Sequence, residues 1–432
     1  MEADILSNSY HLLDSKIAET LVSVAEANGS IIIPDGVEEI EMYSFMRCKK
    51  IKMLSLSSTI KRISRGAFFG CDNLEKIIIP EGVEKIGEYS FSMCNKIKEI
   101  SLPSTIKKID DGTFSGCINL ETVVISEGVE ELSNFSFSGC EKIKELHLPS
   151  SVKKIGDNAF SYCTNLETIV IPEGVEEIGK CSFWGCEKIK NISLPSTIKI
   201  IGDWAFYGCI NLKRIVIPNG VKKIGACVFD ECKKIKKIFL PSTIKKIDDW
   251  TFSDCTNLET IVIPEGVEEI GACVFDKCEK IKEISLPSTI KKIGDKAFPY
   301  CTNLETIVIP EGVERIGKCS FWGCEKIKNI SLPSTIKIIG DWAFSDCTNL
   351  EAIVIPEGVE EIRTCAFNKC EKIKEIFLPS TIKIIGDRAF SGCINLKRLV
   401  IPHGILIDKE MGIPYGVQIV ELYTKEYKNK DI

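Results

Sequence analysis

The sequence has little histidine, no long apolar run and none of the common catalytic motifs. Only His11, His147 and His403 occur in 432 residues, and they lie in three different parts of the chain. No segment approaches the roughly eighteen consecutive apolar residues of a membrane-spanning helix. The glycine-rich phosphate loops and the HExxH zinc motif are also missing. The sequence therefore predicts a protein that is not an enzyme, needs no cofactor and does not span a membrane.

The chain also lacks a basic, apolar start and any excess of positive charge. Met1 to Asp4 are acidic, unlike the first residues of a secretory signal. The 55 Lys and Arg residues are outnumbered by 61 Asp and Glu, so the net charge of −6 gives no general attraction for nucleic acid. We expect a cytoplasmic protein, with the cell surface as the alternative if export follows a route without a visible signal peptide.

What the sequence contains instead is a repeat of 23 residues. Sixteen phenylalanines follow one another at this interval from Phe45 to Phe390, and sixteen cysteines do so from Cys48 to Cys393. A globular enzyme has no reason to keep such a count, whereas every coil of a solenoid places the same residue at the same point of its circumference. We predict a solenoid in which both series, here called the Phe ladder and the Cys ladder, are buried.

The repeat that starts at Cys94 indicates how one coil is built. Ile100 to Leu102 alternates as a half-buried strand does, and Pro103 ends this strand because proline cannot donate a ladder hydrogen bond. A second short extended segment then brings Ile109 into the core. The Gly or Asp that follows allows a tight turn, and Phe114 closes the coil from inside.

This unit resembles the BspA-like class of leucine-rich repeats over about residues 31–402, as in Ile189 to Cys209 and Ile281 to Cys301. The matching pattern is [LI]-x-x-I-x-[IL]-P, then [VI]-x-x-I-G, then A-F and the following Cys. The resemblance implies a leucine-rich-repeat solenoid, a curved right-handed β-rich coil. Its parallel sheet would lie on the concave face and its Phe-centred turns on the convex face. It also implies a cell-surface or secreted protein that binds host proteins or surfaces.

The repeat divides the chain into three expected parts. Residues 1–30 form an N-terminal helical cap, with a short amphipathic helix over Ser15 to Ala27. Residues 31–402 form about 17 coils of BspA-like repeats. Residues 403–432 form a C-terminal cap with a last irregular strand over Val417 to Tyr423.

The cysteines are expected to be reduced. Residues stacked on neighbouring coils point their Cβ atoms in the same direction, which is poor geometry for a disulfide bond. A second row, expected to be exposed, lies five residues before the Cys ladder. It comprises Cys181, Trp204, Cys227, Trp250, Cys273, Lys296, Cys319, Trp342 and Cys365. Its cysteines are about 10 Å apart by coil spacing, too far to share a zinc ion. The row either packs along the turns or forms a ridge that binds a partner.

Charged residues alternate in sign between successive coils. One position reads Lys144, Glu167, Lys190, and another reads Lys153, Glu176, Lys199. Stacked like charges would repel at every step, whereas alternation replaces each repulsion by an attraction. We interpret the pattern as a device that sets the pairing of coils.

One stretch breaks the alternation. Lys213, Lys222 and Lys223 stand where glutamate is expected, and residues 213–246 contain ten Lys or Arg against Asp230 and Glu231. The stretch is either drift on a solvated face or a docking patch for an acidic partner. Nucleic acid is not expected, because only Phe239 is available there for base stacking.

The outward residue of each concave strand lies seven after the ladder cysteine. This row reads Ile78, Ser101, Val124, His147, Val170, Ser193, Val216, Phe239, Val262, Ser285, Val308, Ser331, Val354, Phe377 and Val400. The row would place exposed apolar side chains beside the basic stretch, as a protein interface requires. The candidate partner-binding residues are Lys213, Arg214, Val216, Lys222, Lys223, Lys236, Lys237, Phe239 and Val262.

The sequence thus predicts a non-enzymatic scaffold that binds a protein partner on its concave face, as a monomer or with weak self-association. The alternative is a cell-surface adhesin of the BspA-like kind. No metal site is expected.

Overall fold

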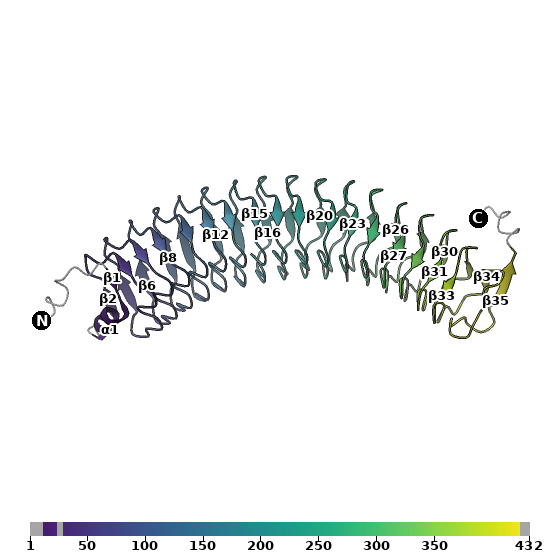
Figure 1. The fold of residues 1–432 in the computed structure, drawn as a ribbon, viewed down its shortest axis with the longest axis horizontal. Helices are drawn as coiled ribbons and strands as arrows, with labels where there is room; N and C mark the ends of the chain where they lie inside the picture. Colours follow the sequence, from purple (N-terminus) through teal and green to yellow (C-terminus); the bar gives the residue numbers. More distant parts are fainter. Residues whose placement is uncertain (1–11, 24–28, 424–432) are drawn as a thin grey trace. The chain divides into compact units, whose positions relative to one another are not determined.

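The computed structural model describes residues 12–23 and 29–423. These residues form short parallel β-strands and one helix, α1 (Ser15–Ser23) (Figure 1). The chain divides into two compact units, an N-terminal unit of residues 1–220 and a C-terminal unit of residues 221–432. Both are built from stacked coils of 23 residues with parallel strands, so each is a β-solenoid, as predicted.

Two columns of strands run through the N-terminal unit. The longer strands are β2 (Ser30–Ile32), β4 (Met53–Ser55), β6 (Lys76–Ile78), β8 (Glu99–Leu102), β10 (Thr122–Ile125), β12 (Glu145–His147), β14 (Thr168–Val170), β16 (Asn191–Ser193) and β18 (Arg214–Val216). The two-residue strands are β1 (Leu12–Leu13), β3 (Glu39–Ile40), β5 (Arg62–Ile63), β7 (Lys85–Ile86), β9 (Lys108–Ile109), β11 (Glu131–Leu132), β13 (Lys154–Ile155), β15 (Glu177–Ile178) and β17 (Ile200–Ile201).

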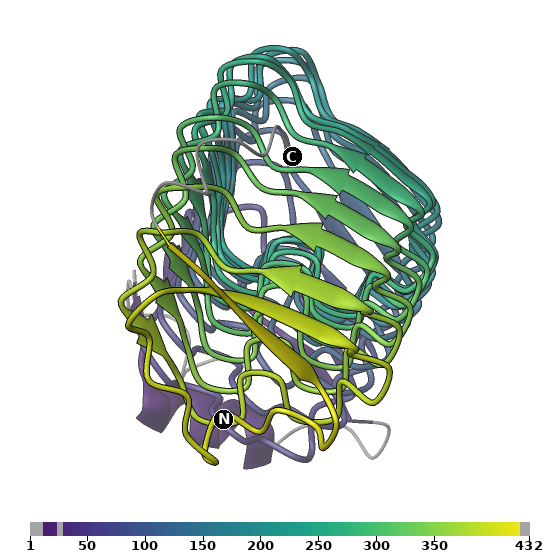
Figure 2. The same cartoon turned by 90° about the vertical axis from the view of Figure 1, so that its right-hand side faces the viewer.

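The C-terminal unit repeats this arrangement, and its longer strands follow one another as a series of parallel arrows in Figure 2. They are β20 (Lys237–Phe239), β22 (Thr260–Val262), β24 (Glu283–Ser285), β26 (Thr306–Val308), β28 (Asn329–Ser331), β30 (Ala352–Val354), β32 (Glu375–Phe377), β34 (Arg398–Pro402) and β35 (Gln418–Leu422). The two-residue strands are β19 (Lys223–Ile224), β21 (Lys246–Ile247), β23 (Glu269–Ile270), β25 (Lys292–Ile293), β27 (Arg315–Ile316), β29 (Ile338–Ile339), β31 (Glu361–Ile362) and β33 (Ile384–Ile385).

The pairing register follows directly from the repeat length. Strands of neighbouring coils pair in parallel with a shift of one repeat, as where Glu99 of β8 lies opposite Thr122 of β10. Within β8 the burial alternates, with Ile100 and Leu102 buried and Ser101 exposed, and the strand ends before Pro103. The predicted strand pattern is therefore confirmed in this coil.

The Phe ladder forms the centre of each unit. Rings of successive coils stack nearly parallel, with centroids 5.1–6.1 Å apart and interplanar angles of 3–18°. Except for Phe45 at the first coil, which is 2% exposed, the ladder rings are fully buried. Stacked, water-excluded aromatic rings contribute much of the apolar area removed from solvent in each coil.

The Cys ladder does more than fill space. From Cys71 to Cys209 and from Cys255 to Cys393, each Sγ–H donates to the backbone carbonyl oxygen of the ladder phenylalanine one coil earlier, over 3.0–3.3 Å. The cysteines are free thiols, as predicted, and Cys48 at the first coil is only half-buried. The ladder thus links adjacent coils through hydrogen bonds that composition and spacing did not reveal.

The second row, which contains Cys181 and Trp204, lies in the turns, and its residues adopt the left-handed backbone conformation. Its φ angles are close to +55°, for example +52° at Cys181 and +54° at Lys296. The row is less exposed than expected, because Cys273, Cys319 and Cys365 are only 3–5% exposed. The prediction of an exposed row is wrong for these three residues, whose small side chains turn into the coil surface.

Because an L-residue other than glycine is strained at such φ angles, Lys296→Gly is expected to raise the free energy of unfolding by up to about 1 kcal/mol. Gly66 and Gly112 already occupy this row with φ of +58° and +60°. The matched control is Lys318→Gly, at an exposed position without positive φ, which should lower stability by about 0.5–1 kcal/mol. Urea titration of both variants measures the difference, and equal losses would contradict the backbone argument.

The two ends of the repeat array differ from the middle. Asp14 caps α1 by accepting the Ile17 amide over 2.8 Å, and the predicted helix residues 24–27 lie outside the described residues. β35 pairs with β34 in the place predicted for the last strand. Val400 was expected to be exposed but is fully buried, because the apolar Phe377 and Val420 flank it in register on both sides.

Candidate functional site

The Lys and Arg side chains of the basic stretch, residues 213–246, are exposed. Some of them belong to the N-terminal unit and the others to the C-terminal unit. Lys222, Lys223, Lys236, Lys237 and Phe239 lie in the first coils of the C-terminal unit. Phe239, at the end of β20, exposes 63% of its surface, an unusual value for an aromatic side chain.

Val262 occupies the same place on β22 and is 46% exposed. Lys213, Arg214 and Val216 belong to the N-terminal unit, where β18 carries Arg214 and an outward Val216 that is 56% exposed. All nine candidate residues are exposed. Their use in binding stays a prediction.

Ion pairs follow the charge alternation elsewhere in the solenoid. In the C-terminal unit, Lys291 Nζ lies 2.9 Å from Glu268 Oε2 and Lys383 Nζ lies 2.7 Å from Glu360 Oε2. The lysine in each pair holds the pKa of the glutamate below its usual value by hydrogen bonding and by its charge. In the N-terminal unit, Lys190 Nζ lies 3.0 Å from Glu167 Oε2. The alternation of charge between coils therefore does produce ion pairs between adjacent coils.

The basic stretch departs from this rule. Among the described residues, Lys213, Lys222, Lys223 and Lys237 form no ion pair, whereas Lys236 Nζ lies 3.2 Å from Glu259 Oε1. The unpaired ammonium groups keep their full charge available to solvent and to an approaching carboxylate. They therefore distinguish this surface from the charge columns that are neutralised by the next coil.

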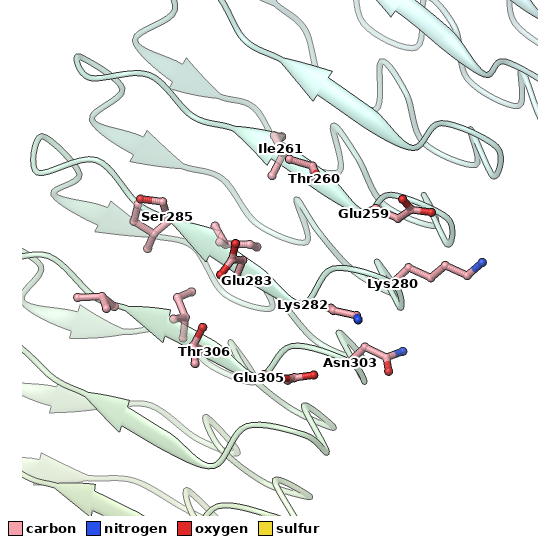
Figure 3. Close-up of a pocket in the computed structure, with 14 residues that line it drawn as sticks. Glu259, Thr260, Ile261, Lys280, Lys282, Glu283, Ser285, Asn303, Glu305 and Thr306 are labelled. Atoms are coloured by element: carbon pink, nitrogen blue, oxygen red, sulfur yellow. The ribbon is translucent and has the colours of Figure 1, made fainter.

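A shallow groove of about 1380 Å³ lies across β22, β24 and β26, which belong to the same column of longer strands as β20 (Figure 3). Lys280, Lys282 and Asn303 lie at one end of the groove and Ser285 toward the other. Glu283 projects between Thr260 of β22 and Thr306 of β26. The groove was not predicted from the sequence. Short Ser and Thr side chains next to longer charged ones leave such a hollow, and this pattern could have indicated it.

The described residues offer no arrangement for metal binding. No group of three or more His, Cys, Asp or Glu side chains converges on one point in residues 12–23 and 29–423. His147 lies on β12, and His403 Nδ1 contacts Glu421 Oε1 at 2.8 Å in the C-terminal unit. His11 lies outside the described residues. No helix in the described part of the chain is long and apolar enough to cross a membrane.

Buried thiols are also poor nucleophiles here. Burial raises the pKa of Cys117, Cys163 and Cys209 to about 12, so these thiols stay protonated at neutral pH. In the second row, burial likewise raises the pKa of Cys181 and Cys319. Neither set has the exposed, lowered-pKa thiolate that covalent catalysis requires.

Comparison with known proteins identifies the repeat. The model of the BspA type leucine rich repeat region matches in six copies over residues 25–140, 96–195, 176–305 and 291–410. The comparison with curated proteins gives no match.

Several solved structures resemble the chain. A leucine-rich repeat protein from Bacteroides ovatus is 27% identical, with a TM-score of 0.65, over 91% of this chain and 92% of that one. A leucine rich cell surface protein from Faecalibacterium prausnitzii is 23% identical, with a TM-score of 0.48, over 76% of this chain and 91% of that one. A leucine rich repeat protein from T. pallidum is 31% identical, with a TM-score of 0.36, over 43% of this chain and 78% of that one.

Proposed function

Because this chain belongs to the BspA-type leucine-rich repeat family, we propose that it is a non-enzymatic scaffold whose strand face binds an acidic protein partner. The observation that carries the proposal is the exposed Phe239 on β20, a strand that also carries Lys237, which has no ion pair among the described residues. Lys222 and Lys223, which also lack an ion pair there, lie at β19, in the column of two-residue strands of the same unit. An aromatic anchor supplies desolvated contact area, and surrounding charges of one sign steer and select the partner.

The strand face supports this proposal by its extent as well as its charge. From Phe239 the outward row continues through Val262 and Val308, which expose 46% and 66% of their surfaces. The groove over β22, β24 and β26 lies beside these side chains. A segment of the partner placed there would meet apolar side chains flanked by hydroxyl and charged groups, as in the core and rim of a protein interface.

The N-terminal unit carries a smaller surface of the same kind. Lys213 and Arg214 precede the exposed Val216 on β18. We propose that this surface serves the same class of acidic partner, through contacts that the N-terminal unit makes by itself.

The proposal predicts that the double substitution Lys222→Glu, Lys223→Glu abolishes partner capture while leaving the fold intact. Each new glutamate would lie one coil before a lysine, Lys245 or Lys246, so alternation would be restored. To measure this, immobilised wild-type and variant proteins are used to capture proteins from the source cell, which are quantified by mass spectrometry. Captured proteins of the proposed kind are acidic, are released by salt and decrease at least ten-fold on the variant.

The matched control is Lys291→Glu, Lys292→Glu, which makes the same change in net charge at the same two positions of another coil. These lysines are already paired, with Lys292 Nζ 2.6 Å from Glu269 Oε1. The control is expected to keep partner capture and to unfold slightly earlier. A captured set that is identical for wild type, variant and control would show that the unpaired lysines are only solvated surface.

Membership of the BspA-type family also supports an adhesin at the cell surface as the second candidate function. The two candidates share the strand face and differ in where it acts. Antibody labelling of intact cells of the source, compared with permeabilised cells, separates them: labelling of intact cells supports the adhesin, and labelling only after permeabilisation supports the intracellular scaffold.

A further inference from the structure

Three aromatic rings gather on the turns of the C-terminal unit, outside the strand face discussed above. Tyr300, Trp322 and Trp342 come from three consecutive coils, and all three are at least partly exposed. The centroids of Tyr300 and Trp322 are 5.0 Å apart, and those of Trp322 and Trp342 are 6.5 Å apart. We call these three residues the aromatic triad.

The triad is not a continuation of the Phe ladder. Its rings are tilted by 46° and 55° to one another, whereas ladder rings are nearly parallel and cover each other's faces. Tilted rings at these distances leave part of each π-face uncovered. Gly323 contributes to this opening, because a Cβ there would lie 2.9 Å from Cδ1 of Tyr300. The bare glycine gives the Tyr300 ring room to lean over the next coil.

The backbone beneath two of the rings lies in the left-handed region that the turns of this solenoid use repeatedly. Tyr300 and Trp342 have φ angles of +55° and +57°. In other coils the place of Trp342 is filled by Gly66 or Gly112 and that of Tyr300 by Gly70 or Gly116, for which this conformation carries no steric cost. Trp204 and Trp250 have the same conformation, with φ angles of +55° and +59°, so it presents the rings on the turns and does not by itself mark a site.

Fixed polar groups adjoin the rings. The carboxylate of Asp346 accepts hydrogen bonds from Trp322 Nε1 at 3.0 Å, from Ser345 Oγ at 2.9 Å and from Lys369 Nζ at 3.1 Å. Asn368 Nδ2 donates to Ser345 Oγ over 3.3 Å. Apolar faces beside a few oriented polar groups are the usual composition of a small-molecule site.

The charges around the triad select the class of ligand. On one side Lys369 neutralises Asp346, and on the other Lys277 Nζ lies 3.1 Å from Asp254 Oδ2. Both ionic groups are therefore compensated before a ligand arrives. The nearby Asp276 keeps Oδ1 without a hydrogen-bond partner, but this oxygen is buried, so a ligand on the ring faces does not reach it for a cation–π site with a paired carboxylate.

We infer that the aromatic triad, with Asp346 and Asn368, binds a neutral saccharide. A pyranose ring presents one face of C–H groups, which fits an uncovered indole or phenol face, and an edge of hydroxyl groups, which fits a carboxylate and an amide. A neutral sugar needs no unpaired charge. The inference concerns a different part of the coil from the proposed protein-docking surface and does not depend on it.

The N-terminal unit contains a related cluster that lacks the polar part. Tyr162, Trp184 and Trp204 occupy the same three repeat positions, but Gly208 replaces Asp346. Tyr207 instead packs edge-on against Trp184, with centroids 5.5 Å apart and an interplanar angle of 84°. The C-terminal triad is therefore expected to be the saccharide site, with one molecule bound per chain.

The test is an array of neutral oligosaccharides of glucose, mannose, galactose and xylose, followed by calorimetry with the strongest responder. Trp342→Ala and Tyr300→Ala should each lower the affinity at least ten-fold. Trp250→Ala is the matched control, because Trp250 lies in the same row with φ of +59°, is 41% exposed and has no ring contact among the described residues. It should leave the affinity unchanged.

Thermal unfolding of each variant separates lost binding from lost folding. If an alanine variant fails to fold, Tyr300→Gly removes the ring while relieving the strained backbone, and it should keep the unfolding temperature and lose binding. The inference is overturned if no neutral oligosaccharide binds the wild-type chain, if only charged glycans bind, or if the triad variants and Trp250→Ala bind equally well.

Discussion

Raising the pH above 9 is expected to unfold this protein over a narrow range, because the buried Cys ladder resists ionisation. Burial raises the pKa of Cys117, Cys163 and Cys209 to about 12 and that of Cys94 and Cys140 well above the ordinary value. In the unfolded chain these thiols ionise near their usual pKa of about 8.5. At pH values between these two pKa values, the unfolded state loses thiol protons that the native state keeps.

The sign and size of the effect follow from proton linkage. A thiol whose pKa is higher in the native state contributes stability that is complete below about pH 8.5 and is lost as the pH rises toward 12. Each such thiol lowers the free energy of unfolding by about 1.4 kcal/mol per pH unit. Because the ladder supplies many of them, the combined slope exceeds about 10 kcal/mol per pH unit, which is comparable with the whole stability of an ordinary domain. Circular dichroism and urea titration between pH 8 and about pH 11 measure this slope.

The control replaces three ladder cysteines together, as Cys117→Ser, Cys163→Ser and Cys209→Ser. Serine does not titrate here and can still donate to the carbonyl oxygen that accepts the thiol, such as Phe91 O for Cys117. The lysine content is unchanged, so lysine ionisation affects both proteins alike. The slope of stability against pH should become less steep by about 4 kcal/mol per pH unit. An unchanged slope would show that the thiols do not cause alkaline unfolding.

Truncation of one ladder ring is expected to give the largest loss of stability for a single substitution. Phe137 is fully buried, and its centroid lies 5.3 Å from that of Phe114 and 5.8 Å from that of Phe160. Phe137→Ala would leave a cavity between two rings that the neighbouring coils hold in place. We expect the free energy of unfolding to fall by about 3–5 kcal/mol. Hydrogen exchange should increase mainly in the adjacent coils, because each coil contacts only its neighbours.

Phe135 provides a control in the same turn. It is 40% exposed, two residues before Phe137, so Phe135→Ala removes the same atoms without opening a core cavity. Its cost should stay near or below about 0.5 kcal/mol. Similar losses for Phe135→Ala and Phe137→Ala would contradict the view that the stacked ladder, and not aromatic content in general, holds the coils together.

Several features of the site could be read from the sequence because they depend on position within one repeat. The outward direction of Phe239 follows from the alternation of the strand that contains it. The absence of glutamate at Lys222 and Lys223 follows from comparison with other coils. Pairing of Lys291 with Glu268 follows from the constant repeat length, which brings equivalent residues opposite each other.

Other features depend on how coils approach one another in space. The hydrogen bond from Cys163 Sγ to Phe137 O needs both the pairing register and the inward rotation of the thiol. The groove beside Glu283 depends on which side chains of three strands leave space between them. The tilt of Tyr300 against Trp322 depends on rotamers and on the room left by Gly323.

The sequence by itself determined the repeat length, the alternation of buried and exposed positions and the identity of the residues that stack. These properties are local or periodic, so a count along the chain reveals them. The tertiary structure alone decided which carbonyl each thiol contacts, how deeply Cys273 and Val400 are buried and where aromatic faces stay open. These properties depend on distances between atoms of different coils, and the spacing of residues along the chain does not determine those distances.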